Sequence, residues 1–150
     1  MVEETRVDGW RAVASWINTD EPTVSVELDR NLGGMWPKVI LTATAREAEH
    51  TAILVGPAPP NDSEITGVHG FVYRAGIADE CISAIASGVS EALGDHRGVE
   101  VHVSTGGVAV DIAELVSRYA AHVATRLLLG KLRNQERSLE SSLAAATPAA

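Results

Sequence analysis

The chain has 150 residues, 45% of them hydrophobic and 21% charged, as expected for one globular domain of ordinary size. Its formal net charge is −8, and its 12 basic residues are scattered among 20 acidic ones, which argues against nucleic acid and anionic membranes as partners. The single cysteine excludes an internal disulfide and a multi-cysteine zinc site. Together with an acidic N-terminus and the lack of a long apolar run, it predicts a cytoplasmic protein.

The first part of the chain contains one clear strand and one ambiguous segment. Residues 7–17 have apolar spacings that suit either a short helix or a bent strand, and both interpretations stay open. Residues 18–22, Asn-Thr-Asp-Glu-Pro, predict a turn, because Asn and Asp form local hydrogen bonds and Pro fixes φ. Residues 23–28 then alternate between polar and apolar types, which is typical of a strand with one buried face.

The middle of the chain is less well determined. Residues 35–49 suit a helix by the spacing of their apolar side chains and a buried strand by their content of β-branched residues, so this segment is undecided. Residues 50–55 predict a short buried strand, and the proline-rich residues 57–66 predict a loop. Another short strand is expected over residues 68–73.

The second half is organised around a helix–strand–helix unit from Gly76 to Leu129. Valine occupies every second position of residues 99–104, and helical stripes of apolar residues lie on both sides of this strand. The glycine-rich residues 104–107 are expected to close the strand. We expect one domain over residues 1–133, with residues 134–150 as a polar, alanine-rich tail or helical extension.

A strand between two one-faced helices must lie in a sheet that the helices cover. We therefore expect an α/β protein of the α+β kind: a two-layer sandwich with a mixed sheet of about four to five strands, covered by two or three helices. The last predicted helix ends in Leu127, Leu128 and Leu129, which cannot all face one core because successive helical residues are about 100° apart. At least one of them should meet a second subunit or the extension beyond Gly130, and we expect a homo-oligomer.

Candidate catalytic residues lie on the strand over residues 23–28 and directly after it. Ser25 and Glu27 share the face opposite the apolar residues, and Asp29 borders a Gly-Gly loop where α/β proteins often bind ligands. Arg30 is a candidate partner for Glu27 if that face is covered. No histidine has the spacing of a metal-ligand pair, so no metal is expected. Cys81, beside two acidic residues, is expected to be an inert packing residue.

In the order of its segments the chain resembles the formaldehyde-activating enzyme family. The resembling segments are Gly9 to Val13, Thr23-Val24-Ser25-Val26-Glu27-Leu28, Thr51-Ala52-Ile53-Leu54, Pro57 to Pro60, Ala75-Gly76-Ile77-Ala78, Val99 to Ser104, and Ala124-Thr125-Arg126-Leu127. The resemblance implies a ribosomal S5 domain 2-like fold assembled into a ring, and condensation or lyase chemistry of a small carbonyl compound with a pterin-like carrier. One departure concerns the site, since the family's catalytic histidine would fall on Ser25, and a hydroxyl cannot shuttle protons near neutral pH as imidazole does. Gly76 to Asp111 also resembles the bacterial alkaline-shock proteins.

Two functions follow. The first is a small-molecule enzyme or binding protein with Glu27, Ser25 and Asp29 at its site, for which a tetrahydropterin or a tetrahydrofolate is the candidate cofactor. The second is a non-catalytic oligomeric interaction module whose apolar helix faces serve assembly. The low aromatic content of 4% and the lack of an obvious acid–base pair favour the second, whereas the resemblance favours the first.

Overall fold

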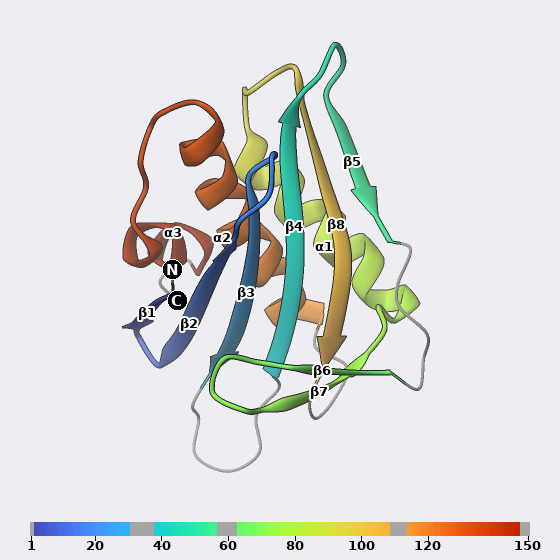
Figure 1. The fold of residues 1–150 in the computed structure, drawn as a ribbon, viewed down its shortest axis with the longest axis vertical. Helices are drawn as coiled ribbons and strands as arrows, with labels where there is room; N and C mark the ends of the chain where they lie inside the picture. The colour runs from blue at the N-terminus through green and yellow to red at the C-terminus, as the bar shows by residue number, and fades with distance from the viewer. Residues whose placement is uncertain (1, 31–37, 57–62, 109–113, 148–150) are drawn as a thin grey trace.

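The computed structural model describes residues 2–30, 38–56, 63–108 and 114–147. Over these residues the chain forms one curled sheet of eight strands with three helices (Figure 1). The elements in chain order are β1 (Val2–Val7), β2 (Trp10–Ile17), β3 (Thr23–Arg30), β4 (Lys38–Glu47), β5 (Ala52–Val55), β6 (Glu64–Thr66), β7 (Val72–Ala75), α1 (Asp79–Leu93), β8 (Val99–Val108), α2 (Glu114–Leu132) and α3 (Leu139–Ala146).

The strands follow the order β1-β2-β3-β4-β8-β7-β6, and each neighbouring pair in this order is antiparallel. β5 lies off this path and pairs in parallel with the first half of β8, whereas β7 pairs with the far end of the same strand. Two short strands therefore share one edge of β8. The sheet has mixed direction, as the sequence predicts.

The α+β class is confirmed, but the expected size of the sheet is wrong. It has eight strands rather than four to five within the described residues. Of the two segments left open between helix and strand, residues 7–17 belong to a β-hairpin over residues 2–17, and residues 38–47 form a long strand. Part of the expected loop over 57–66 is strand β6. Each of these segments adds a strand that the apolar spacing alone did not distinguish from helix or loop.

The N-terminal hairpin turns at Asp8 and Gly9, whose φ angles are +49° and +86°. Positive φ at both central residues of a two-residue loop defines the type I′ turn, which matches the twist of antiparallel strands and favours Asp-Gly. The turn places Val7 directly opposite Trp10 and fixes the register of every further pair in β1 and β2.

The helices cover one face of the sheet (Figure 1), and the core contains buried apolar residues of β2, β3, β4 and β8 together with those of the helices. In β3, Val24, Val26 and Leu28 are fully buried in the core that α2 completes, as their alternation predicts. Ser25, Glu27 and Asp29 therefore lie on the opposite face. The predicted helix–strand–helix unit is confirmed as α1, β8 and α2, and Gly94 ends α1 with φ +51°. In the sequence, Asp111 with Glu114 three residues later resembles a capping box for the last predicted helix, but Asp111 lies outside the described residues.

Residues 104–107 are not the loop that the sequence predicts, because β8 continues through them to Val108. Their glycines let other segments pass close to the strand. A Cβ on Gly106 would lie 2.8 Å from Cγ1 of Ile77, and one on Gly107 would lie 2.9 Å from the carbonyl oxygen of Arg74. These two glycines are therefore needed for close packing rather than for a turn.

The C-terminal extension is a packed element. After α2 the chain reverses near Asn134, which has φ +55°, and α3 then packs against α2 and β1. The amide of Ser141 donates to Oγ of Ser138, which caps the helix at 3.0 Å. Leu143 is fully buried in the core. Leu127, Leu128 and Leu129 are each 4% exposed or less. Because the extension helps to bury them within the same chain, their burial does not require a second subunit.

Candidate functional site

Four charged residues form a straight row across four neighbouring strands, on the face that the helices leave uncovered. Arg6 of β1 lies opposite Arg11 of β2, Arg11 lies opposite Asp29 of β3, and Asp29 lies opposite Lys38 of β4. Directly opposed residues in an antiparallel sheet have their Cβ atoms about 5 Å apart, so like charges in such positions repel. Three cations with one carboxylate among them give this row a net positive charge.

The centre of the row is an ion pair between Arg11 and Asp29. Nε and Nη2 of Arg11 donate to the same carboxylate oxygen of Asp29, at 3.0 and 2.7 Å. The side chain of Asp29 is 5% exposed and that of Arg11 is 20% exposed. Burial by itself would lower the pKa of Arg11, but the hydrogen bond and the negative charge of Asp29 outweigh it and raise that pKa. The guanidinium is thus held in one orientation.

Lys38 is more deeply buried than the two arginines of the row. It is 8% exposed, and its Nζ lies 3.1 Å from the centre of the Phe71 ring. Burial lowers the pKa of the Lys38 ammonium; among the nearby charges Asp29 and Glu27 oppose this shift, while Arg11 acts in the same direction as burial. The same ring lies 5.8 Å from Cζ of Arg11. Phe71 therefore packs over both cations.

These residues line a pocket of about 320 Å³, which we call the basic pocket. Its lining residues are Arg6, Gly9, Trp10, Arg11, Asp29, Lys38 and Phe71. Gly9 belongs to the turn of the N-terminal hairpin, and Phe71 precedes β7, so the pocket lies between the end of the sheet and the β6–β7 hairpin. Its volume is at the lower end of the range for sites of small organic ligands.

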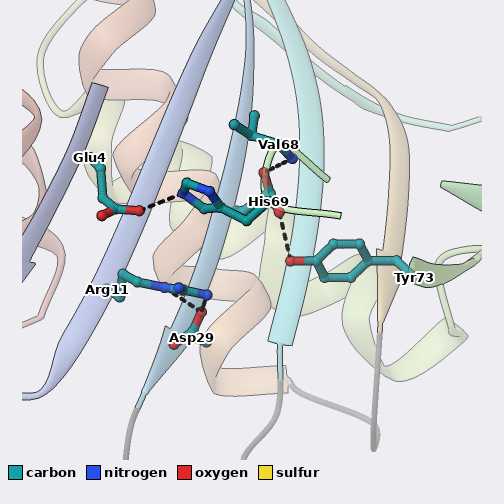
Figure 2. A network of polar contacts seen from close by, with 7 residues as sticks. Glu4, Arg11, Asp29, Val68, His69 and Tyr73 are labelled. Carbon is teal, nitrogen blue, oxygen red and sulfur yellow. Dashed lines mark hydrogen bonds and ion pairs between the residues drawn. The ribbon is translucent and has the colours of Figure 1, made fainter. Parts of the chain in front are cut away.

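The roof of the pocket, the β6–β7 hairpin, is tied to the sheet by Glu27. The carboxylate of Glu27 accepts hydrogen bonds from the amide of Val68 and from the hydroxyl of Tyr73, each at 2.9 Å (Figure 2). Burial, the charge of Glu27 and this hydrogen bond raise the pKa of Tyr73, so the hydroxyl keeps its proton. Gly67 makes the approach feasible, since a Cβ there would lie 1.9 Å from Oε1 of Glu27.

A second tie joins the same hairpin to the first strand. Nε2 of His69 lies 2.7 Å from a carboxylate oxygen of Glu4 (Figure 2). Both side chains are well exposed, at 48% and 39%, so this pair contributes less than the buried bonds of Glu27. The hairpin is thus held to β1 through His69 and to β3 through Val68 and Tyr73, and Phe71 lies between His69 and Tyr73 in the chain.

The structure places the three sequence-predicted site residues on one face of β3 but in different surroundings. Asp29 lines the basic pocket, and Glu27 is 6% exposed beneath the hairpin. Ser25 is half-buried, lies opposite Ser15 and Thr42, and makes no side-chain hydrogen bond with the described residues. The expected partner of Glu27, Arg30, points elsewhere: its Cζ lies 5.2 Å from the centre of the Trp10 ring.

Sequence reasoning missed Arg6, Arg11, Lys38 and Phe71, although part of the signal was present. Asp8-Gly9 is a strong β-hairpin signal, and it would place Arg6 opposite Arg11. The predicted turn at residues 18–22 would then place Arg11 opposite Asp29. No pattern in the sequence identifies Lys38 or Phe71, because they belong to β4 and to the β6–β7 hairpin, two segments whose positions beside β3 the sequence does not predict.

Larger pockets lie elsewhere within the described ranges, but none of them has a comparable excess of cationic side chains in its lining. A pocket of about 510 Å³ lies where α2 and α3 meet β1 and β2, and charged side chains of both signs line it, among them Glu3, Lys131, Glu136 and Arg137. A pocket of about 350 Å³ includes the buried thiol of Cys81. Among the described residues, no three His, Cys, Asp or Glu side chains come close enough together to hold a metal ion.

None of the helices in the described part of the chain is both long and apolar enough to cross a membrane. Comparison with known proteins found no matching family model, no matching curated protein and no matching solved structure.

Proposed function

We propose that this chain is a small-molecule enzyme or binding protein that takes a small organic anion in the basic pocket. The observation that carries the proposal is the row of Arg6, Arg11 and Lys38 with Asp29 as its only carboxylate, in a chain of net charge −8. Two arginines directly opposite each other repel, and an anion bound between them would remove that repulsion.

Arg11 and Arg6 would contribute to anion binding in different ways. Asp29 holds Arg11 through Nε and Nη2, and the other N–H groups of a guanidinium remain able to donate. Arg6 is exposed and makes no ion pair or side-chain hydrogen bond with the part of the chain that the structure describes. Phe71 supplies an apolar wall. A small carboxylate or a similar anion fits such a combination of charge and size.

The reaction that we propose for the bound compound is taken from the resemblance to the formaldehyde-activating enzyme family. It would be condensation or lyase chemistry of a small carbonyl compound, with a tetrahydropterin or a tetrahydrofolate as carrier. Of the three candidate catalytic residues, Asp29 is supported by its place in the pocket. Both oxygens of Glu27 accept bonds from the hairpin, which supports an anchoring role, and its role as a general base stays a prediction together with that of Ser25.

Calorimetric titration with oxalate, lactate and inorganic phosphate tests the proposal. Arg6→Gln should weaken the binding of a carboxylate roughly 10- to 150-fold, because one charge-assisted hydrogen bond is worth about 1.5–3 kcal/mol. Arg46→Gln is the matched control, since Arg46 lies at the other end of β4, where its exposed side chain pairs with Glu100. Failure of every anion to bind would overturn the proposal, as would equal losses in the two variants. A parallel titration with formaldehyde and tetrahydrofolate tests the carrier.

The alternative function, a non-catalytic homo-oligomeric module, is favoured by exposed apolar side chains on the β6–β7 hairpin. Val68, Phe71 and Val72 are 45%, 40% and 50% exposed there, which gathers large apolar side chains on one short segment. Light scattering at micromolar concentration tests it. A mass above that of the monomer, lost in Val72→Ser, would support assembly through the hairpin, and a monomer mass for the unchanged chain would contradict it.

A further inference from the structure

The chain has two lysines, and the structure places them in contrasting surroundings. Lys131, in the last turn of α2, is exposed, and its Nζ lies 5.5 Å from the centre of the Trp16 ring. Lys38 is 8% exposed and lines the basic pocket, with its Nζ 3.1 Å from the centre of the Phe71 ring. Both amines contact an aromatic face, so burial and nearby charge are what distinguish them.

Lys38 is surrounded by charged groups from several elements. Arg6 and Arg11 lie on its β1 and β2 side, Asp29 lies directly opposite it on β3, and Glu27 lies further along that strand. The hairpin contributes Tyr73, which keeps its proton. A buried ammonium loses its hydration, so burial favours the neutral amine, and the charge of Arg11 favours it further. The neutral amine is the nucleophilic form.

We propose that Lys38 is a carbonyl-reactive amine, which forms an imine with a small 2-oxo acid whose carboxylate Arg6 and Arg11 hold in the basic pocket. The inference rests on the proposed function, because the arginines must first bind the acid. It adds a covalent site and a substrate class that anion binding alone does not require. Phe71 and the adjoining hairpin fix the position of the amine before the acid arrives.

The reaction balances within the site. The lone pair of the Lys38 nitrogen attacks the carbonyl carbon, a C–N bond forms, and the electrons of the carbonyl π bond pass to oxygen, which takes a proton. The nitrogen then loses one proton, and the new hydroxyl takes a second one. The nitrogen lone pair forms the C=N bond as the C–O bond breaks and water leaves, and the resulting iminium loses its last N–H proton to give the imine. Asp29, opposite Lys38 in the register, is the carboxylate placed to relay these protons. No oxidant or reductant takes part.

Reductive trapping tests the inference with the full chain. Glyoxylate is the 2-oxo acid used, and cyanoborohydride reduces any imine to a stable secondary amine that peptide mass spectrometry assigns to one lysine. At neutral pH we expect Lys38 to react about tenfold or more faster than Lys131, because the pocket holds the carbonyl beside the amine. Lys131 is thus an internal control in every sample. Equal rates at the two lysines would overturn the inference.

Two further arms separate the inference from the proposed function. Acetaldehyde carries a carbonyl but no carboxylate, so Arg6→Gln should slow trapping of glyoxylate at Lys38 far more than trapping of acetaldehyde. Oxalate should compete with glyoxylate. Anion binding without preferential trapping at Lys38 would overturn the imine and leave the proposed function standing. Trapping of glyoxylate that neither oxalate nor Arg6→Gln reduces would overturn the anion site. Lys38→Met should abolish the Lys38 adduct while Lys131 still reacts.

Discussion

The hydroxyl of Tyr73 donates a 2.9 Å hydrogen bond to Oε1 of Glu27, and this bond ties the β6–β7 hairpin to the middle of β3. Tyr73 is 1% exposed and Glu27 is 6% exposed, so the carboxylate is removed from water and depends on the hairpin for its partners. The hairpin in turn depends on Glu27 to hold Phe71 over the basic pocket. The stability of the hairpin and the shape of the pocket should therefore change together.

Removing the Tyr73 hydroxyl tests this dependence. Tyr73→Phe should lower the free energy of unfolding by about 1–3 kcal/mol, because a buried carboxylate loses one of its two donors. Urea denaturation measures the change. Tyr119→Phe is the control: its hydroxyl makes no hydrogen bond with the described residues, and its ring, 5.2 Å from that of Trp10, would stay in place. Equal losses in the two variants would contradict the role of the Tyr73–Glu27 bond.

Gly67→Ala should loosen the hairpin by a different route. The added Cβ would lie 1.9 Å from Oε1 of Glu27, too close for any side chain, so the hairpin or the carboxylate must move. We expect a loss of about 1–3 kcal/mol in the free energy of unfolding, as for other overpacked sites. Hydrogen exchange at the amide of Val68, which donates to Glu27, should also become faster. Unchanged exchange there would show that the close approach does not matter.

The C-terminal helix should contribute to stability as part of the core. Leu143→Ala in α3 should cost about 2–5 kcal/mol, because the side chain is fully buried and its loss leaves a cavity. Leu115→Ala, at a position that is 51% exposed on α2, should cost little. Thermal or urea unfolding of both variants measures the difference. If Leu143→Ala were as stable as the control, residues 134–150 would be the dispensable tail that the sequence also allowed.

The strands and helices with a single buried face could be predicted from the sequence, and those without one could not. The alternation over residues 23–28 and 99–104 specifies which side chains face the helices, because a period of two leaves no other choice. Residues 38–47 are largely buried on both faces, since the helices cover one face and the hairpin covers part of the other, so their continuous apolar pattern does not distinguish strand from helix.

The site was less predictable than the fold because it depends on register. Glu27 and Asp29 were chosen from their place on one strand, and that strand does carry one side of the pocket. Arg11 joins them through one turn, Arg6 through two successive turns, and Phe71 only through a hairpin that spans short, weakly patterned strands. Local spacing in the sequence does not show which side chains meet across a sheet unless each intervening turn is assigned correctly.

The charges beside Lys38 should move its pKa in opposite directions when they are removed. Asp29→Asn takes away a negative charge that favours the ammonium, so the pKa of Lys38 should fall further. Arg11→Gln takes away a positive charge that disfavours the ammonium, so the pKa should rise. The rate of acylation by dilute acetic anhydride, followed by peptide mass spectrometry over a range of pH, reports the neutral amine directly.

The midpoint for Lys38 should therefore shift to lower pH in Asp29→Asn and to higher pH in Arg11→Gln. The midpoint for Lys131 should stay where it is in both variants, because it lies on α2, away from the row of charges. Shifts of the same sign in the two variants would mean that altered burial, rather than the lost charge, controls the amine. Equal shifts at Lys131 would show a general change in the protein. Opposite shifts confined to Lys38 would identify the Arg11–Asp29 pair as the group that sets its reactivity.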